Sequence, residues 1–512
     1  MGVLAVLLFG CSTGSADGAG EPSFLIEGAN VIDGTGAPGR TVSVRVAGGQ
    51  IAAVGTLSPE PDEEVVAAHG LVLTPGFIDT HSHHDRGLSE SPQALGAVSQ
   101  GITTVVVGQD GGSELPLARL FQRLETSPVA VNVASYVGHG TLRRYVMEDD
   151  FRREATADEV LEMEALLALE MEEGALGLST GLEYDPGIYS STEEVVALAR
   201  VTGARGGRYI THLRSEDRDF FSALAEAISI AEAAELPVQI SHMKLAMRGL
   251  WGRAGEALAL LDEARGRGLD ITADVYPYEY WQSTMTVLFP ERDLTDRSAA
   301  QFALDELVPP EGMLIGRFEA NPEIEGLTLA QISESRGTDA VTTFLSLLAE
   351  AYPPDGDDGN ATGPRESIVG TSMTTEDIRQ LLSWEHTNVA SDGALAGAHP
   401  RGFGSHTRVL GRFVDTGNGL SLEEAVHKMT GLAAAHVGIE GRGVIEAGAV
   451  ADLVLFDPET VGDRATPEEP HLPSSGIERV WVAGEVVYEP AGATGATPGV
   501  VIRRSGIESS DN

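Results

Sequence analysis

The sequence predicts an α/β fold, a (β/α)8 TIM-like barrel with a small β-sandwich domain formed from both chain ends. Three observations lead to this prediction. Strand-like apolar runs alternate with amphipathic helical stretches through the middle of the chain, both ends carry short strand-like runs with Gly-rich turns, and polar residues follow nearly every central run. Strand–helix alternation predicts parallel strands joined by crossover helices, and the number of units favours a closed barrel.

The central units can be followed along the chain. ITTVVVG precedes the helical stretch ELPLARLFQRLE, VAVNVASYVG precedes TADEVLEMEALLALEMEEG, and GALGLST precedes TEEVVALARVTGARG. RYITHL then precedes DFFSALAEAISIAEAAEL, and VQISHM precedes GEALALLDEARGRG. LDITADVYPY supplies one more strand, and NVASDG at residues 388–393 is expected to supply the last.

These patterns divide the chain into segments. The alternation breaks after the YPY sequence and resumes before NVASDG, which predicts an insertion in the barrel. We expect a signal or lipoprotein segment with a tether at 1–22, the β-sandwich at 23–74 and 436–504, the barrel at 75–435 with its insertion at about 291–365, and a tail at 505–512.

The first residues raise the question of export. Residues 3–9, VLAVLLF, form an apolar run that is too short to span a bilayer, which takes ~20 residues. An apolar run that ends in small residues is typical of a secretory signal, and the sequence LFGC resembles a bacterial lipoprotein signal with Cys11 as the lipidated residue. We therefore expect an exported protein, periplasmic or anchored to the membrane through Cys11, and a cytoplasmic one if this run is not a signal.

Charge and cysteine content exclude several classes of function. The chain of 512 residues carries 34 Lys and Arg against 77 Asp and Glu, a net charge of −43. Nucleic acid as a partner is not expected, because phosphate binding needs clustered basic residues. The single cysteine excludes a disulfide framework within the chain and a zinc site of several thiolates. A small molecule is the expected substrate.

Polar residues follow the predicted barrel strands at the ends where an active site forms. Because the carboxyl ends of the strands meet at one mouth of a barrel, these side chains are expected to converge. Four histidines with two carboxylates is a composition typical of a metal site. The six residues are His81, His83, Asp110, His212, His242 and Asp392.

Several motifs resemble the amidohydrolase superfamily, and more closely its N-acyl-D-amino-acid deacylase (D-aminoacylase) family. The resemblance extends from about Phe24 to Arg504. The motifs are PGFIDTHSHHD (75–85), GITTVVVGQDGGS (101–113), VGHGTLR (137–143), GALGLSTGLEYDPG (174–187), THLRSED (211–217), ISHMK (240–244), DVYPY (274–278), SDG (391–393) and HPRGFG (399–404).

The resemblance implies a metal-dependent hydrolase that cleaves the amide bond of N-acyl-D-amino acids or of dipeptides with a D-residue. A divalent metal lowers the pKa of the water it binds to about 7 and polarises the carbonyl group. Asp392 is the implied general acid and base. The implied cofactor is Zn²⁺, as one or two ions, and another divalent metal would also suit oxygen ligands.

The resemblance also assigns the ligands. Asp110, His212 and His242 are expected around the main metal, and His81 and His83 around a second or weaker position. Asp110 stands where close relatives in that family have a cysteine ligand, and it gives harder oxygen coordination. Glu183 is a candidate extra ligand, with binding of a substrate amine or an exposed turn as its alternatives.

The positions of the two lysines bear on competing functions. Many amidohydrolases bridge two metals with a carbamylated lysine on the fourth strand, but no lysine precedes Lys244 here. This counts against a cyclic amidase of hydantoinase or dihydroorotase type. A metal-free scaffold protein is a further alternative, but such relatives usually lose the ligands that this chain retains.

The remaining candidates concern substrate binding. Lys244 lies two residues after His242, so on a continued strand it would point into the same mouth. It resembles the contact to the substrate carboxylate in the deacylase family, and arginine is suited to the same recognition. The further candidates for substrate binding are Tyr278, Arg401, His139 and Arg143.

Overall fold

The computed structural model describes residues 23–353, 365–414 and 419–504, and within them the predicted (β/α)8 barrel is confirmed. The first three barrel strands form one parallel sheet, and β9 (Val137–Gly138) forms another with the remaining five barrel strands. A parallel bridge between Ser82 and Gly393 joins the ends of the first and last strands. The eight barrel strands are β6 (Phe77–Asp79), β7 (Ile102–Val107), β8 (Asn132–Ser135), β10 (Gly177–Gly181), β11 (Arg208–His212), β12 (Val238–Ile240), β13 (Ile271–Val275) and β17 (Thr387–Val389).

Helices follow the barrel strands as the amphipathic patterns predict. The helix over residues 157–172 begins at a capping box, in which Thr156 and Glu159 bond to each other's backbone N–H groups, and it buries Met163 and Leu167. The outer helices are α2 (Leu117–Thr126), α3 (His139–Met147), α4 (Ala157–Glu172), α5 (Thr192–Gly203), α6 (Phe220–Ala234), α7 (Ala254–Gly266), α11 (Thr375–Ser383), α12 (Arg401–Arg408), α13 (Leu422–Met429) and α14 (Gly431–Val437).

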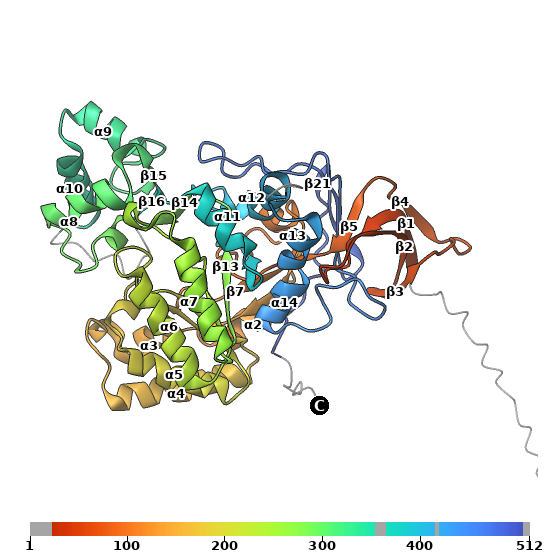
Figure 1. The fold of residues 1–512 in the computed structure, drawn as a ribbon, viewed down its shortest axis with the longest axis horizontal. Helices are drawn as coiled ribbons and strands as arrows, with labels where there is room; N and C mark the ends of the chain where they lie inside the picture. The colour runs from red at the N-terminus through yellow and green to blue at the C-terminus, as the bar shows by residue number, and fades with distance from the viewer. Residues whose placement is uncertain (1–22, 354–364, 415–418, 505–512) are drawn as a thin grey trace, which may run out of the picture.

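Both chain ends share one sheet, which lies to the right of the barrel in Figure 1. Antiparallel pairing of β5 with β18 joins the two halves, and Ile26, Leu73, Leu453 and Trp481 belong to its buried core. The nine strands are β1 (Ser23–Val31), β2 (Arg40–Ala47), β3 (Gln50–Gly55), β4 (Glu64–Ala67), β5 (Val72–Pro75), β18 (Leu453–Phe456), β19 (Ile477–Val482), β20 (Glu485–Glu489) and β21 (Gly492–Ala493).

The insertion between β13 and β17 is larger and more regular than the predicted segment of about 291–365. It contains an antiparallel sheet in the order β14 (Tyr280–Ser283), β16 (Glu366–Thr371), β15 (Met313–Phe318). It also contains α8 (Arg297–Phe302), α9 (Leu329–Arg336) and α10 (Ala340–Ala351). The predicted boundaries were wrong because β14 and β16 pair across a long stretch of chain, which no local pattern indicates. The insertion and the terminal sheet lie at opposite ends of the long axis (Figure 1).

The N-terminal segment of residues 1–22 and the tail of residues 505–512 lie outside the described residues, as does most of the polar loop PPDGDDGNATGPRE. The export prediction therefore stays a prediction. Among the helices that the structure describes, none combines the length and the apolar character needed to cross a membrane.

Candidate metal centre

The first barrel strand supplies two histidines. His81 and His83 follow β6, and a hydrogen bond from the His83 N–H to the Gly393 carbonyl oxygen (2.8 Å) ties this segment to the last strand. His81 is fully buried, and neither of its ring nitrogens has a hydrogen-bond partner within the described part of the chain. Buried polar atoms are normally satisfied, so these nitrogens fit a ligand that the protein does not itself supply.

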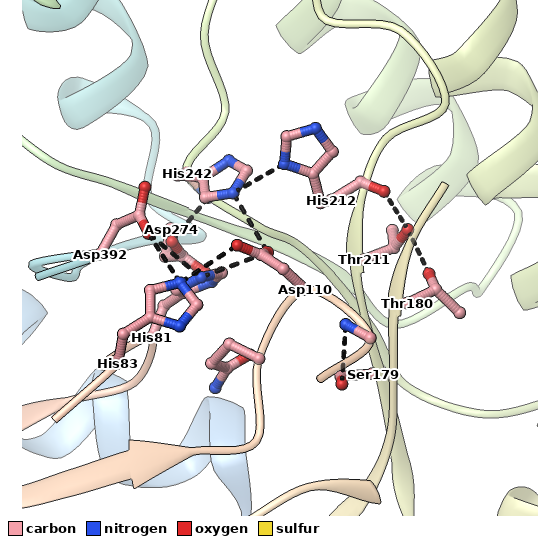
Figure 2. Close-up of polar contacts among 12 residues, drawn as sticks. His81, His83, Asp110, Ser179, Thr180, Thr211, His212, His242, Asp274 and Asp392 are labelled. Carbon is pink, nitrogen blue, oxygen red and sulfur yellow. Dashed lines mark hydrogen bonds and ion pairs between the residues drawn. The ribbon is translucent and has the colours of Figure 1, made fainter. Parts of the chain in front are cut away.

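Asp110, after β7, lies between two groups of histidines. Its Oδ1 is 3.4 Å from Nε2 of His81 and 3.3 Å from Nε2 of His242, and its Oδ2 is 3.2 Å from Nε2 of His83. Figure 2 shows its carboxylate pointing into the space between them. The backbone is tightly packed here, because a Cβ on Gly181 would lie 2.3 Å from the Asp110 carbonyl oxygen.

His212 and His242 follow from the fifth and sixth barrel strands. His212 is the last residue of β11, His242 follows β12, and Nδ1 of His212 lies 3.0 Å from Nε2 of His242. Ligands about 2.0–2.3 Å from a zinc ion lie roughly 3–4 Å apart, which the spacing of Asp110, His212 and His242 matches.

Two ligand groups therefore share one carboxylate. In each group the possible ligand atoms all lie within 4.8 Å of one another. The first group would hold the main metal and the second a further ion. The groups are Asp110, His212 and His242, and His81, His83, Asp110 and Asp392.

Glu183 is part of a third group. Its Oε2 lies 2.9 Å from Nε2 of His212, and it combines with His212 and Glu216 within the same distance limit. The alternative that Glu183 is an exposed turn residue is wrong, because only 13% of its side chain is exposed.

Two carboxylates that the sequence did not nominate hold His242. Oε1 of Glu216 lies 3.0 Å from Nδ1 of His242, and Oδ1 of Asp274 accepts a hydrogen bond of 2.7 Å from the His242 N–H. A carboxylate on the second ring nitrogen fixes the tautomer and orientation of a metal-binding histidine. The signal for Glu216 was present in THLRSED, four residues after His212.

Asp392 presents one oxygen to the histidines and the other to an arginine. Its Oδ1 is 3.2 Å from Nε2 of His83, and its Oδ2 accepts a hydrogen bond of 2.5 Å from Arg401. Burial alone would raise the pKa of Asp392, but the positive charge of Arg401 holds it well below the ordinary value. Asp392 is therefore a carboxylate, able to accept a proton at Oδ1.

Backbone conformation marks the same residues. Asp110, His242 and Asp392 have φ values of 53°, 32° and 50°, in the left-handed region that residues other than glycine seldom adopt. Such conformations concentrate at functional sites, where the surrounding structure imposes them. At this mouth they follow the second, sixth and eighth strands.

His399 links Arg401 to the insertion. Its Nε2 donates to the Tyr280 carbonyl oxygen (2.8 Å), and its Nδ1 accepts from the Arg401 N–H (3.0 Å). Burial and the charge of Arg401 lower the pKa of His399, so it is neutral with the proton on Nε2. The insertion thus helps to position the partner of Asp392.

The predicted substrate residues divide into two sets. Lys244 and Arg401 line a small inner pocket, together with Tyr276 and Trp281. Tyr278 does not line it, because its side chain is fully buried against His399. The prediction that Tyr278 contacts the substrate was therefore wrong. Tyr276, two positions earlier in the motif DVYPY, lines the pocket instead.

His139 and Arg143 also fail to reach the cavity. Both are fully buried and bind Glu194, with His139 Nε2 at 2.7 Å and Arg143 NH1 at 2.7 Å from Oε1. Arg143 also donates to the carbonyl oxygens of Phe151 and Arg153. Their predicted role in substrate binding is therefore replaced by a structural one, which fastens α3 to α5.

A barrel whose carboxyl mouth gathers histidines around a shared carboxylate, with a further carboxylate beside them, has the architecture of a metal-dependent hydrolase. The donor set suits zinc, because imidazole and carboxylate oxygen are both zinc ligands. Strand β10 carries the sequence GLSTG, without a lysine that could bridge two ions.

Comparison with known proteins identifies the particular family. The sequence matches the amidohydrolase family over residues 64–303 and 387–488, and the chain belongs to it. It is 37% identical to an N-acyl-D-glutamate deacylase of Alcaligenes xylosoxydans xylosoxydans, over 94% of this chain and 96% of the relative. It is 35% identical to a D-aminoacylase of the same organism, over 94% and 97%.

Solved structures agree. A D-aminoacylase structure concerned with its binuclear metal centre superposes with a TM-score of 0.83 at 35% identity, covering 94% of this chain and 99% of that one. An N-acyl-D-glutamate deacylase of Bordetella bronchiseptica, complexed with zinc and a phosphonate inhibitor, gives 0.83 at 34% identity, covering 94% and 100%. D-Hydantoinase, at 15% identity and a TM-score of 0.56, shares the fold.

Proposed function

We infer that this chain is a metal-dependent N-acyl-D-amino-acid deacylase, which hydrolyses the amide bond between an acyl group and the nitrogen of a D-amino acid. The observation that carries this inference is the position of Asp110. Its carboxylate belongs to both ligand groups, and Asp392 belongs to one of them. The named relatives over nearly the whole chain are deacylases of this class.

The protein's residues have separate tasks in this reaction. When bound, the divalent metal supplies Lewis acidity toward the carbonyl oxygen and a lowered pKa for water. Oδ1 of Asp392 accepts the proton that water loses as it attacks the carbonyl carbon, and returns it to the amide nitrogen as the C–N bond breaks. Arg401 holds Oδ2, so Oδ1 stays directed at the reacting atoms.

The inner pocket suits the amino-acid half of the substrate. Lys244, Arg401 and Tyr276 line it together, and they combine two cations with a phenol hydroxyl. Arginine and lysine next to a hydroxyl donor are suited to an α-carboxylate. We propose that these three groups bind it, which puts the scissile amide beside Asp392.

A panel of substrates tests the function. Purified, zinc-loaded protein should release the free amine from N-acetyl-D-amino acids or L-Xaa-D-Xaa dipeptides, and not from the L-enantiomers. Ring opening of 5-substituted hydantoins in place of these reactions would favour the cyclic amidase. Absence of hydrolysis of every linear D-amide, with zinc bound, would refute the deacylase.

We further propose that the protein is exported and lipidated at Cys11. The apolar run VLAVLLF followed by LFGC supports this proposal, as does the Ser/Gly/Ala-rich stretch from Ser12 to Glu21, which would act as a tether. Labelling with a fatty-acid analogue in a bacterial host should modify the natural chain and not Cys11→Ala. Equal recovery of both proteins from the cytoplasm would contradict export.

A further inference from the structure

A wide outer cavity adjoins the inner pocket at the barrel mouth. It has a volume of about 1650 Å³, and it extends from His83, Asp110 and Asp392 to the insertion, where Leu314 and Tyr352 line it. Small-molecule pockets usually measure about 300–1,000 Å³. This cavity is therefore far larger than an acetyl group needs, and part of its wall is built by the insertion.

The charge of this wall is opposite to that of the chain as a whole. The chain has 77 acidic and 34 basic residues, whereas the cavity is lined by six arginines and five carboxylates. The arginines are Arg86, Arg144, Arg152, Arg292, Arg317 and Arg401. The carboxylates are Asp110, Asp185, Glu325, Glu366 and Asp392.

Several of these charges are committed to other roles. Asp110 and Asp392 belong to the metal centre, and Arg401 holds Asp392. Asp185 accepts a hydrogen bond of 2.8 Å from Arg292, which also donates to the Glu183 carbonyl oxygen. Arg292 is thus a fixed part of the cavity wall, and its charge is paired with the Asp185 carboxylate.

Arg86 is the most available of the cations. It is exposed, it follows His83 by three residues, and its N–H donates to the His83 carbonyl oxygen (3.2 Å). Within the described residues its guanidinium group has no hydrogen-bond or ion-pair partner, although acidic residues outnumber basic ones more than twofold in the chain. A free guanidinium group beside the metal centre is suited to bind a carboxylate.

Asp392 lines both the inner pocket and the outer cavity, so the outer cavity is the one that faces the acyl group. With the α-carboxylate at Lys244, Tyr276 and Arg401, and the scissile amide beside Asp392, the acyl chain extends into the outer cavity. We propose that this cavity accepts an extended acyl group that carries a carboxylate, such as an acidic residue in a peptide ending in a D-amino acid. The proposal rests on the proposed function and names the acyl half of its substrate.

A pair of isosteric substrates tests the proposal. N-succinyl and N-succinamoyl derivatives of one D-amino acid differ only in a terminal carboxylate against a neutral amide. We expect kcat/KM to be at least about tenfold higher for the succinyl compound at low ionic strength, with the ratio falling as salt screens the arginines. A longer acyl group, an N-terminal L-Glu-L-Ala extension, should also be accepted.

Two variants locate the effect. Arg86→Gln should lower the succinyl/succinamoyl ratio by about fivefold, because one charged hydrogen-bonding partner is lost. Arg267→Gln removes the same charge from the residue that follows α7, outside the cavity, where Arg267 pairs with Glu263 at 3.4 Å, and should leave the ratio unchanged. A ratio that persists in both Arg86→Gln and Arg317→Gln would refute the arginine wall as its cause.

Other outcomes separate this proposal from the function beneath it. Hydrolysis of N-acetyl-D-amino acids with a succinyl/succinamoyl ratio near one would overturn the acyl assignment and leave the deacylase intact. A preference for N-acetyl-D-glutamate over N-acetyl-D-glutamine, without a preference for the succinyl compound, would also overturn the acyl assignment. It would show that the second carboxylate of the substrate is recognised on the amino-acid half and not on the acyl half. Absence of hydrolysis for every acyl group tested would instead refute the deacylase itself.

Discussion

Lys244 donates to both carboxylate oxygens of Glu216, each at 2.5 Å, and its Nζ also lies 2.9 Å from Nδ1 of His242. Burial alone would lower the pKa of Lys244, but Glu216 raises it above the ordinary value, so the ammonium stays charged. Glu216 therefore holds a substrate-binding cation on one side and a metal-binding histidine on the other.

Replacing Lys244 should separate carboxylate binding from chemistry. Charged hydrogen bonds contribute about 1.5–3 kcal/mol, so Lys244→Met should raise KM for an N-acyl-D-amino acid roughly 10–100-fold and much less for its amide. Because the variant leaves Glu216 unpaired, Lys244→Met/Glu216→Gln is the matched control. If KM rose equally for the acid and for its amide in both variants, Lys244 would not be a contact of the substrate carboxylate.

Replacing Asp392 should lower turnover strongly while the metal stays bound. General acid and base catalysis contributes about 10²–10⁴-fold, so Asp392→Asn should lower kcat by that order. The metal held by Asp110, His212 and His242 should remain, which metal analysis by plasma emission would verify. Unchanged turnover would show that another group moves the proton.

Asp110 is expected to govern metal affinity, because both ligand groups share it. Loss of even an outer partner of a ligand costs about 10–100-fold in metal affinity, so Asp110→Asn should cost at least that much. Competition with a chelator would measure the loss, and zinc should restore activity to chelated natural protein. Glu325→Gln, on the outer wall, should keep the natural affinity; equal affinities in the two variants would argue against Asp110 as a ligand.

The Arg143–Glu194 pair should matter for stability and not for binding. Removing one partner of a buried ion pair costs about 3–5 kcal/mol, so Arg143→Met should lower the free energy of unfolding by that amount. KM of the folded protein should be unchanged, because neither side chain lines the cavity. Urea unfolding followed by circular dichroism measures the first quantity, and a raised KM would restore Arg143 to the substrate site.

Glu366 gives the insertion a pH dependence. Burial raises its pKa to about 7, although it accepts hydrogen bonds from Tyr352 and from the Met285 N–H. Its folded pKa lies above the unfolded value, so its contribution to stability is complete below about pH 4.5 and falls as pH rises to about 7. Glu366→Gln should match the natural protein at pH 5 and exceed its unfolding free energy by up to about 3 kcal/mol at pH 8. A constant difference between these pH values would contradict this.

Much of the fold was predictable, because the barrel strands and helices carry their periodicity locally. The helical stretch TADEVLEMEALLALEMEEG and the apolar run ITTVVV both appear in the structure where the sequence predicts them, as α4 and β7. The insertion was not predictable in this way, since its central strand, β16, pairs with β14 and β15 through contacts between distant segments.

The sequence by itself determined which chemistry was available. Four histidines and two carboxylates follow barrel strands, no lysine is placed to form a carbamate bridge, and the motifs resemble those of the deacylase family. Only the tertiary structure decided what each side chain faces. It brings Glu216 to Lys244, turns Tyr276 and not Tyr278 toward the pocket, and buries His139 and Arg143 against Glu194. The physical reason is that local hydrophobic periodicity, which involves neighbouring residues, specifies where the strands lie. The group that pairs with a charged side chain comes from a distant segment, and the two segments meet only when the barrel closes.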